Sequence, residues 1–219
     1  MSTLVMLLVF AINAERTLGM SDPDYCKNLD HQSAEIVTPL SKEKRTVPCL
    51  GGWLIFQRRV FGNVSFQRNW EEYKTGFGEI NGDFWLGLES LFEITHTWPM
   101  LLRIKMESWS GKTGEATFSK FEIMTEKDKY KLIKADNVTL RHLTMSAFGG
   151  HFGLDFSTNS PCAQKYTGGW WWGNCYHTNL NSRFPMDDER SRNCKKCMNW
   201  NYFDGEHPLK YSEMAIHRK

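Results

Sequence analysis

Six cysteines constrain the fold of this chain more than any other feature of its sequence. They are Cys26, Cys49, Cys162, Cys175, Cys194 and Cys197. Each disulfide ties together two distant points of a chain, and six cysteines allow about 15 pairings. An even number of cysteines in an exported protein predicts a disulfide framework, whereas the cytosol keeps thiols reduced. The compartment of the protein therefore decides how these residues are interpreted.

The N-terminal residues favour export. Residues 4–12 read LVMLLVFAI, an unbroken apolar run. The run is too short to span a bilayer, which takes about 20 residues, and it has the length of a secretory h-region, with Ala14 as a small residue at the cleavage point. We therefore predict a signal peptide over residues 1–14, a short leader over 15–25 and one folded domain over 26–219. A buried first strand or helix is the alternative, because the basic n-region is missing.

Two further features agree with a secreted, extracellular protein. Asn63 and Asn137 begin the triplets Asn-Val-Ser and Asn-Val-Thr, which are acceptor motifs for N-glycosylation. No other stretch of the chain approaches the apolar length of a transmembrane helix, so we expect no membrane span.

Composition excludes several classes of protein. Hydrophobic residues make up 41% and charged residues 24% of the 219 residues, which argues against intrinsic disorder and for one domain. The net charge of +2 argues against a nucleic-acid partner. The sequence contains no Ser/His/Asp order, nucleophile elbow or phosphate loop, so we predict that the protein is not an enzyme.

Hydrophobic periodicity predicts an antiparallel sheet with short helices. The expected strands are residues 53–59, 101–109, 114–124 with a bulge or turn near Lys120, 129–135 and 210–217, and the expected helices are residues 69–74 and a short one within 84–91. From Phe148 to the last strand the periodicity is weak, and long loops of this kind usually carry function.

Several motifs in a fixed order resemble one family. They are GGWLIFQRR over residues 51–59, FQRNW over 66–70, YKTGFG over 73–78, FWLGL over 84–88, GGWWW over 168–172 with Cys175, and NLN over 179–181. With these motifs the chain resembles the fibrinogen C-terminal domain of fibrinogen chains, ficolins, tachylectins, tenascins and angiopoietin-related proteins. The resemblance runs from about Cys26 to Arg218. It implies an α+β fold with a central antiparallel sheet, short helices and a loop-rich C-terminal region held by disulfides.

The resemblance implies two disulfides, Cys26–Cys49 and Cys162–Cys175. It leaves Cys194 and Cys197 open. Their C-x-x-C spacing suits a redox pair, a zinc site or a structural disulfide, the last either between these two cysteines or to another chain. We favour the structural disulfide, because a thioredoxin-like context and paired zinc ligands are both missing.

Family members usually hold calcium just before the second of these bridges. The matching stretch of this chain is residues 154–161, in which Asp155 is the only acid. Calcium needs roughly six to eight oxygen ligands. We therefore expect a degraded calcium site and no cofactor.

The resemblance places a ligand site beside the Cys162–Cys175 bridge. The candidate ligand-binding residues there are Trp172, Asn174, Cys175, Tyr176, His177 and Lys195. Tyr176 stands where ficolin-like lectins commonly have His, and Cys194 with Lys195 stands where their acetyl pocket has an aromatic and a small residue. The resemblance therefore implies a recognition site here, but not specificity for acetyl groups.

The Trp170–Trp172 run has two interpretations: core packing, which we favour for at least two of the rings, or one exposed ring that stacks on a sugar or anchors a protein partner. The cationic residues around Cys194 and Cys197 also have two interpretations. They form either a solvated surface or a contact for an anionic glycan or an acidic receptor face. These residues are Arg190, Arg192, Lys195 and Lys196.

Two functions follow from the resemblance. The first is a lectin-like module that binds surface glycans in innate immunity. The second is an angiopoietin-like protein ligand for a cell-surface receptor. Lectins of this family gain avidity through stalks, and this chain shows none, so an oligomer would need a disulfide or a partner subunit.

Overall fold

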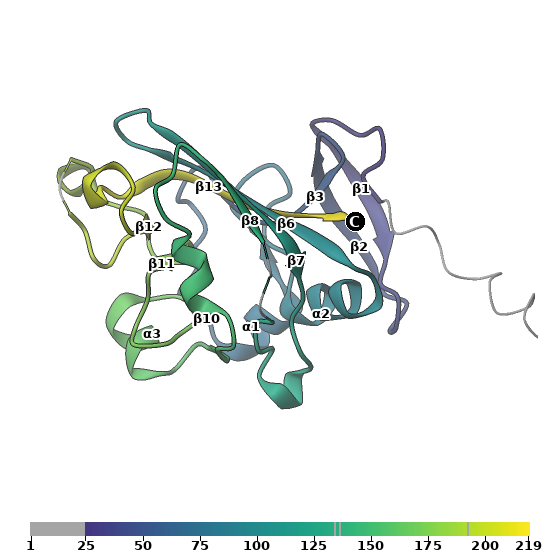
Figure 1. The fold of residues 1–219 in the computed structure, drawn as a ribbon. Coiled ribbons are helices and arrows are strands. Elements are labelled where there is room, and N and C mark those ends of the chain that lie inside the picture. The colour runs from purple at the N-terminus through teal and green to yellow at the C-terminus, as the bar shows by residue number, and fades with distance from the viewer. Residues whose placement is uncertain (1–24, 134, 136, 192) are drawn as a thin grey trace, which may run out of the picture.

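The computed structural model describes residues 25–133, 135, 137–191 and 193–219. The predicted signal peptide (1–14) and nearly all of the predicted leader (15–25) lie outside the described residues. The C-terminal strand of the described chain runs through the middle of its largest sheet (Figure 1).

That sheet is antiparallel throughout its main path, with the strand order β1-β2-β3-β13-β6-β7-β8. Its strands are β1 (Gln32–Val37), β2 (Lys44–Leu50), β3 (Trp53–Arg59), β13 (Leu209–Arg218), β6 (Met100–Ser108), β7 (Thr113–Phe121) and β8 (Val138–Arg141). Two short strands, β4 (Phe77–Gly78) and β5 (Phe84–Trp85), attach to β3. Because β13 pairs with both β3 and β6, the C-terminal strand lies between two strands from the first half of the chain.

The alternation over residues 101–109 becomes strand β6, whose even-numbered residues are all buried. The predicted bulge near Lys120 is confirmed. Leu102 pairs with Phe118 and Met100 pairs with Phe121, so two residues of β7, Ser119 and Lys120, face one residue of β6.

The strand predicted over residues 129–135 is wrong. Among the described residues of that segment, only Leu132 forms a ladder contact, an isolated bridge to Ile123. Lys129 and Tyr130 have positive φ angles, which an extended strand does not allow. The backbone bonds on both sides: Ile133 N–H donates to Glu122 at 2.9 Å, and Leu132 N–H donates to Leu154 in the loop that follows at 3.0 Å. Alternation therefore reported which side chains are buried, not which backbone groups pair.

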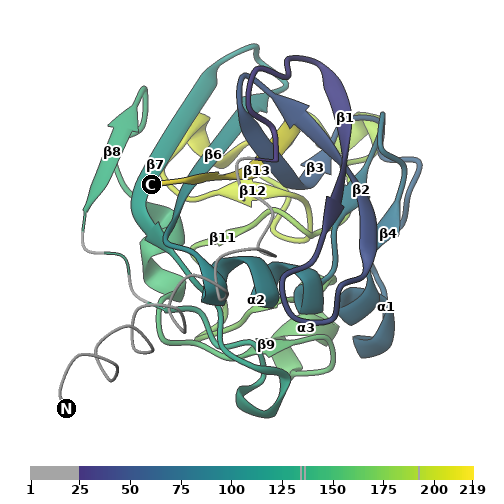
Figure 2. The same cartoon turned by 90° about the vertical axis from the view of Figure 1, so that its right-hand side faces the viewer.

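The helices are α1 (Trp70–Thr75), α2 (Leu88–Thr97) and α3 (Pro161–Tyr166). The helix predicted over residues 69–74 is confirmed as α1; the structure adds that Asn69 caps it in a capping box with Glu72 and that Gly76 ends it at φ +96°. The predicted helix within 84–91 begins only at Leu88, because residues 84 and 85 pair as strand β5. Helices α1 and α2 lie on the same side of the sheet (Figures 1 and 2).

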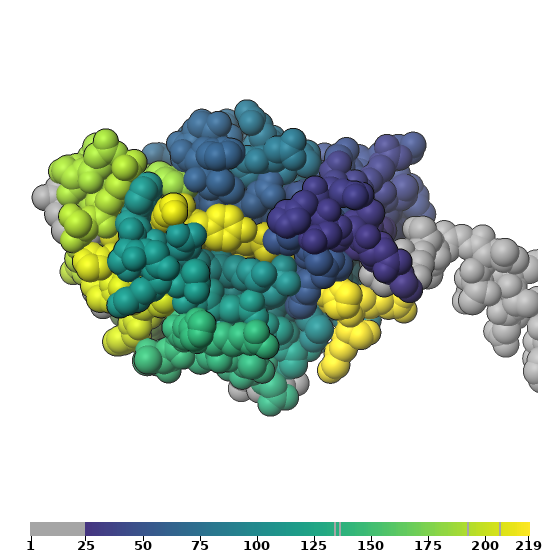
Figure 3. Space-filling view, turned by 90° about the horizontal axis from the view of Figure 1, so that it is seen from above, coloured from purple at the N-terminus to yellow at the C-terminus, as the bar shows by residue number. Residues whose placement is uncertain are grey.

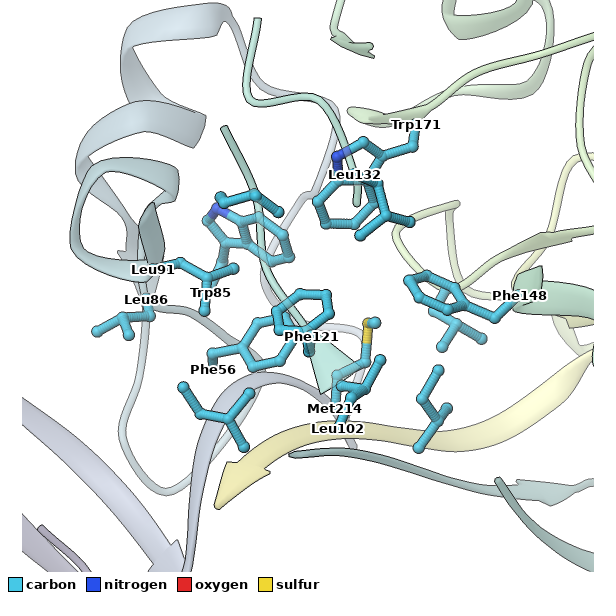
Figure 4. Packing of buried hydrophobic residues seen from close by; sticks show 14 of the residues in the cluster. Phe56, Trp85, Leu86, Leu91, Leu102, Phe121, Leu132, Phe148, Trp171 and Met214 are labelled. Carbon is cyan, nitrogen blue, oxygen red and sulfur yellow. The ribbon is translucent and has the colours of Figure 1, made fainter. Parts of the chain in front are cut away.

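The core lies between the sheet and these helices and continues under the C-terminal loops. Phe56 of β3 stacks on Phe121 of β7 with ring centroids 5.3 Å apart, and Trp85, Phe148 and Trp171 extend the cluster (Figure 4). Each of these rings is at most 1% exposed, so the core depends on large buried aromatic area.

The remainder of the chain consists of short elements at one end of the sheet. They are η1 (Glu126–Asp128), η2 (Ala147–His151), β9 (Phe156–Ser157), β10 (Trp170–Trp171), β11 (Thr178–Asn179), η3 (Asp187–Glu189), β12 (Asn199–Trp200) and η4 (Asp204–Glu206). Figure 3 shows the yellow-green residues of this region, from about 175 to 200, at the opposite end of the molecule from the purple β1–β2 hairpin.

Buried polar side chains attach these loops to the sheet. Gln57 of β3 donates to the carbonyl of Leu180 at 3.0 Å and to the side chain of Asn181 at 3.2 Å. The guanidinium of Arg59 donates to the carbonyl of Ser182 at 2.6 Å. If these buried groups lost their partners, each would lower the free energy of unfolding by about 1–3 kcal/mol or more. Their bonds therefore fix residues 180–182 against the sheet.

Candidate ligand-binding site

A polar hollow of about 430 Å³ opens among the C-terminal loops. Its described lining residues are Lys165, Tyr166, Asn174, Cys175, Tyr176, Asn193, Cys194, Lys195, Asn199 and Asn201. They come from the end of α3, from the segment after β10, and from the loop that leads into β12. Three segments far apart in the sequence therefore meet at one surface site.

Disulfides hold all three segments: one bond joins the first two, and another closes a loop in the third. Cys162 bonds to Cys175, as the resemblance implied, and Cys194 bonds to Cys197 within the chain. The third bond, Cys26–Cys49, joins the N-terminal residues to β2 at the other end of the domain. Of the interpretations of the C-x-x-C pair, the structure shows the intrachain disulfide.

Glu189 lies close to this last bond, with its Oε2 atom 3.7 Å from the Cys197 sulfur. A carboxylate and two cysteine sulfurs in one place resemble a partial zinc site. Zinc binds thiolates, however, and both sulfurs here are in a disulfide. The described residues therefore hold no zinc at this position.

Tyr176 connects the two disulfide-closed loops. Its hydroxyl donates to the carbonyl of Lys195 at 2.5 Å, and its ring meets that of Tyr166 edge-on at 4.8 Å. The hydroxyl of Ser182 lies beneath, 2.7 Å from the carbonyls of both Tyr166 and Lys196. The backbone on both sides of the hollow is thus held in place before any ligand arrives.

Four of the six predicted ligand-binding residues line the hollow: Asn174, Cys175, Tyr176 and Lys195. Trp172 does not, since it is 8% exposed and its indole N–H donates to the carbonyl of Ser157 at 3.0 Å. The other two rings of the triplet are fully buried. The expectation of an exposed, sugar-stacking tryptophan in this run is therefore wrong, because all three rings pack into the protein.

His177 also does not line the hollow. Its ring lies against Gly150, whose missing side chain leaves the space, and 6.2 Å from the ring of His151. His151 is 1% exposed, and its Nδ1 lies 2.7 Å from the carbonyl of Trp171. Its Nε2 accepts the backbone N–H groups of His177 and Thr178 at 3.3 and 3.2 Å. Burial is the main cause that lowers the pKa of His151 to about 4. This neutral imidazole therefore supports the backbone that follows Tyr176.

The motif analysis missed five lining residues: Lys165, Tyr166, Asn193, Asn199 and Asn201. Lys165 and Tyr166 follow Cys162 by only three and four residues, so the implied Cys162–Cys175 bond was the signal for them. The asparagines had no such signal, because β12 pairs with β11 in a way that no periodicity shows.

The implied calcium site does not fit the residues present. The two oxygens of Asp155 lie 3.5 Å from the ammonium groups of Lys129 and Lys131. Two ammonium groups take the place that a divalent cation would occupy beside this carboxylate.

The neighbouring carbonyl oxygens are also in use. Ser157 accepts the Trp172 indole N–H, and the carbonyl of Asn159 accepts the side chain of Gln164 at 3.1 Å. With one carboxylate and engaged carbonyls, this loop lacks the six to eight oxygen ligands that calcium needs.

The comparisons with known proteins follow from this fold and site. The family model described as "Fibrinogen beta and gamma chains, C-terminal globular domain" matches residues 49–219. The chain belongs to this family. The resemblance stated from its motifs is therefore confirmed, and so is the expected fibrinogen-type fold.

Curated relatives of this family member include angiopoietins. Angiopoietin-1 of Mus musculus is 36% identical over 176 residues, which cover 76% of this chain and 34% of that protein. Angiopoietin-related protein 7 of Homo sapiens is 34% identical over 172 residues, covering 76% and 49%. The chain thus spans about a third to a half of the length of these relatives.

Solved structures agree. The fibrinogen-like globe domain of human ANGPTL2 superposes with a TM-score of 0.79 at 29% identity, covering 94% of this chain and 97% of that one. That of human ANGPTL6 gives 0.80 at 27% identity, covering 92% and 96%. In the part of the chain that the structure describes, no helix has the length and apolarity to cross a membrane.

Proposed function

We propose that this chain is a secreted, non-enzymatic recognition module, and that it acts as a protein ligand for a cell-surface receptor through the hollow. One observation carries the proposal: three segments, held by two disulfides, present a preformed polar hollow of about 430 Å³ at the surface. The angiopoietin relatives support this function over glycan binding in innate defence, which is the second candidate.

Secretion is part of the proposal. It rests on the predicted signal peptide over residues 1–14, on the intrachain disulfides, and on the two glycosylation motifs. Asn63 and Asn137 are both exposed, as acceptors of N-linked glycans must be. We propose no cofactor, and the folded domain is taken to be residues 26–219.

Glycan binding has its own support in the asparagine amides and tyrosine rings of the hollow, which are groups that bind sugar hydroxyls and sugar faces. The lysines and the absence of an aromatic cage do not favour an acetyl pocket. A glycan array separates this candidate from the first, since a receptor ligand gives no specific signal there.

The test is binding of the purified protein to cells. We expect saturable binding to a receptor-bearing cell type, lost when Asn174→Ala and Tyr176→Ala are combined. Leu40→Ala is the matched control, because Leu40 is 56% exposed and lies in the β1–β2 turn at the other end of the molecule. Wild-type protein that binds no cell type, or binding that survives the double substitution, would contradict the proposed function.

A further inference from the structure

The described lining of the hollow carries positive charge and no negative charge. Lys165 and Lys195 line it from two different segments, and none of the described lining residues is an Asp or a Glu. Both lysines are exposed, and the ammonium group of Lys165 lies 5.2 Å from the ring centre of Tyr166. Neither lysine forms an ion pair with any described residue, so both charges remain available to a ligand.

The three acids nearest to Lys195 in sequence lie near arginines. Asp187 pairs with Arg190 at 2.6 Å. Glu189 accepts both terminal nitrogens of Arg183 at 2.7 and 2.6 Å, and this side-chain bond is the main cause that raises the pKa of Arg183. The charge of Asp188 also helps to raise that pKa. Because the arginines take these carboxylates, the field of the lysines is not neutralised from within the loop.

The backbone positions of the two lysines are fixed relative to each other. Lys165 precedes Tyr166, whose carbonyl contacts the Ser182 hydroxyl, and the carbonyl of Lys196 contacts the same hydroxyl. Tyr176 holds the carbonyl of Lys195 from the other side. Two cations on a preorganised frame favour a ligand that presents two or more negative charges at a matching spacing.

Neutral groups of the lining indicate what the rest of the ligand is. The side-chain amides of Asn174 and Asn201 each carry a donor and an acceptor, which is the pairing that a peptide backbone needs. A peptide with acidic side chains satisfies both the lysines and the amides.

We infer that the hollow binds an acidic peptide segment of the partner protein, with its carboxylates facing Lys165 and Lys195. This inference rests on the proposed function in placing recognition at the hollow, and it adds the chemistry of the ligand. Sulfated or sialylated glycans share the negative charge and are separated from the peptide by the experiment.

The experiment flows the secreted protein over an immobilised, biotin-linked tetraglutamate peptide. The comparison surfaces carry a tetraglutamine peptide and a sulfated heparin oligosaccharide. The test variant is Lys165→Gln/Lys195→Gln. The control variant, Lys42→Gln/Lys127→Gln, removes the same charge from exposed lysines of the β1–β2 turn and of η1.

We expect the protein to bind tetraglutamate, and the test variant to bind it about tenfold more weakly or worse, while the control variant is unchanged. Binding weakens as salt is raised, because exposed charges are screened over about 10 Å at 0.1 M. No binding to tetraglutamate, equal binding by the test variant, or stronger binding to the sulfated oligosaccharide than to the peptide would overturn the inference.

Failure of this inference differs from failure of the proposed function. If cell binding is lost with Asn174→Ala/Tyr176→Ala but survives Lys165→Gln/Lys195→Gln, the hollow is the site and charge is not its basis. If tetraglutamate binds as expected but no cell type is bound, the ligand chemistry stands and the receptor function fails.

Discussion

The hydroxyl of Tyr176 donates a 2.5 Å hydrogen bond to the carbonyl of Lys195 and so links the loop closed by Cys162–Cys175 to the loop closed by Cys194–Cys197. Each disulfide restrains only its own loop. This bond, together with the Ser182 hydroxyl, sets how the two loops face each other across the hollow.

Removal of that hydroxyl tests the link. We expect Tyr176→Phe to cost about 0.5–1.5 kcal/mol at most, the usual net value of one hydrogen bond, and to leave the fold intact. Hydrogen exchange should accelerate at residues 194–197 and stay unchanged in β6. Tyr25→Phe is the control, since the Tyr25 hydroxyl donates to the carbonyl of Val37, far from the hollow. Unchanged exchange at 194–197 would show that the bond does not order the loop.

The two C-terminal disulfides should differ in their effect on stability. In the chain-entropy model the Cys162–Cys175 bond contributes about 3 kcal/mol and the shorter Cys194–Cys197 loop about 2 kcal/mol. We therefore expect replacing the first pair by Ala to lower the free energy of unfolding more than replacing the second. Urea unfolding of the two double variants measures this order, and the reverse order would contradict it.

His151 makes stability depend on pH. Its folded pKa of about 4 lies below the 6.5 of an unfolded histidine, so the unfolded chain takes up a proton first as pH falls. The stabilisation that neutral His151 gives is fully present above pH 6.5. Between pH 6.5 and 4 the free energy of unfolding falls by about 1.4 kcal/mol per pH unit, about 3 kcal/mol in total.

The measurement for His151 is urea unfolding at several pH values across that range. His151→Gln should be less stable at pH 7 and should show a shallower fall in stability towards pH 4. Exposed His31 provides the control, and His31→Gln should follow the wild-type curve. Identical pH profiles for wild type and His151→Gln would refute the assignment.

Calcium should not affect this domain. The ammonium groups of Lys129 and Lys131 lie beside Asp155, and the loop carbonyls are bonded within the protein. We expect the same Tm with millimolar calcium and with EDTA. A rise of several degrees with calcium would show that a site forms despite the lysines.

Much of the fold was predictable because its signals are local. The helix α1 and the alternation of β6 depend on neighbouring residues, and both predictions are confirmed. The segment 129–135 alternates equally well, yet its backbone bonds to residues 122–124 on one side and to the loop at residues 153–156 on the other, and no local pattern reveals the second partner. Burial leaves a periodic trace in sequence, whereas the choice of hydrogen-bond partner does not.

The site was predictable only where a cysteine marks it. Asn174, Cys175 and Tyr176 were found because they surround the implied second bridge. The sequence predicts Trp172 as a ligand contact, but its indole N–H donates to the carbonyl of Ser157 instead. The asparagines of β12 reach the hollow through tertiary pairing alone.

The most direct test of the account is photo-crosslinking on living cells from within the hollow. A photoreactive amino acid replaces Asn174, which lines the hollow and is exposed, and a second protein carries it at Leu40 as the control. The account predicts that only the Asn174 probe crosslinks to a single cell-surface protein, and that excess tetraglutamate peptide suppresses the product. Crosslinking from Leu40 but not from Asn174 would place recognition elsewhere and contradict the account.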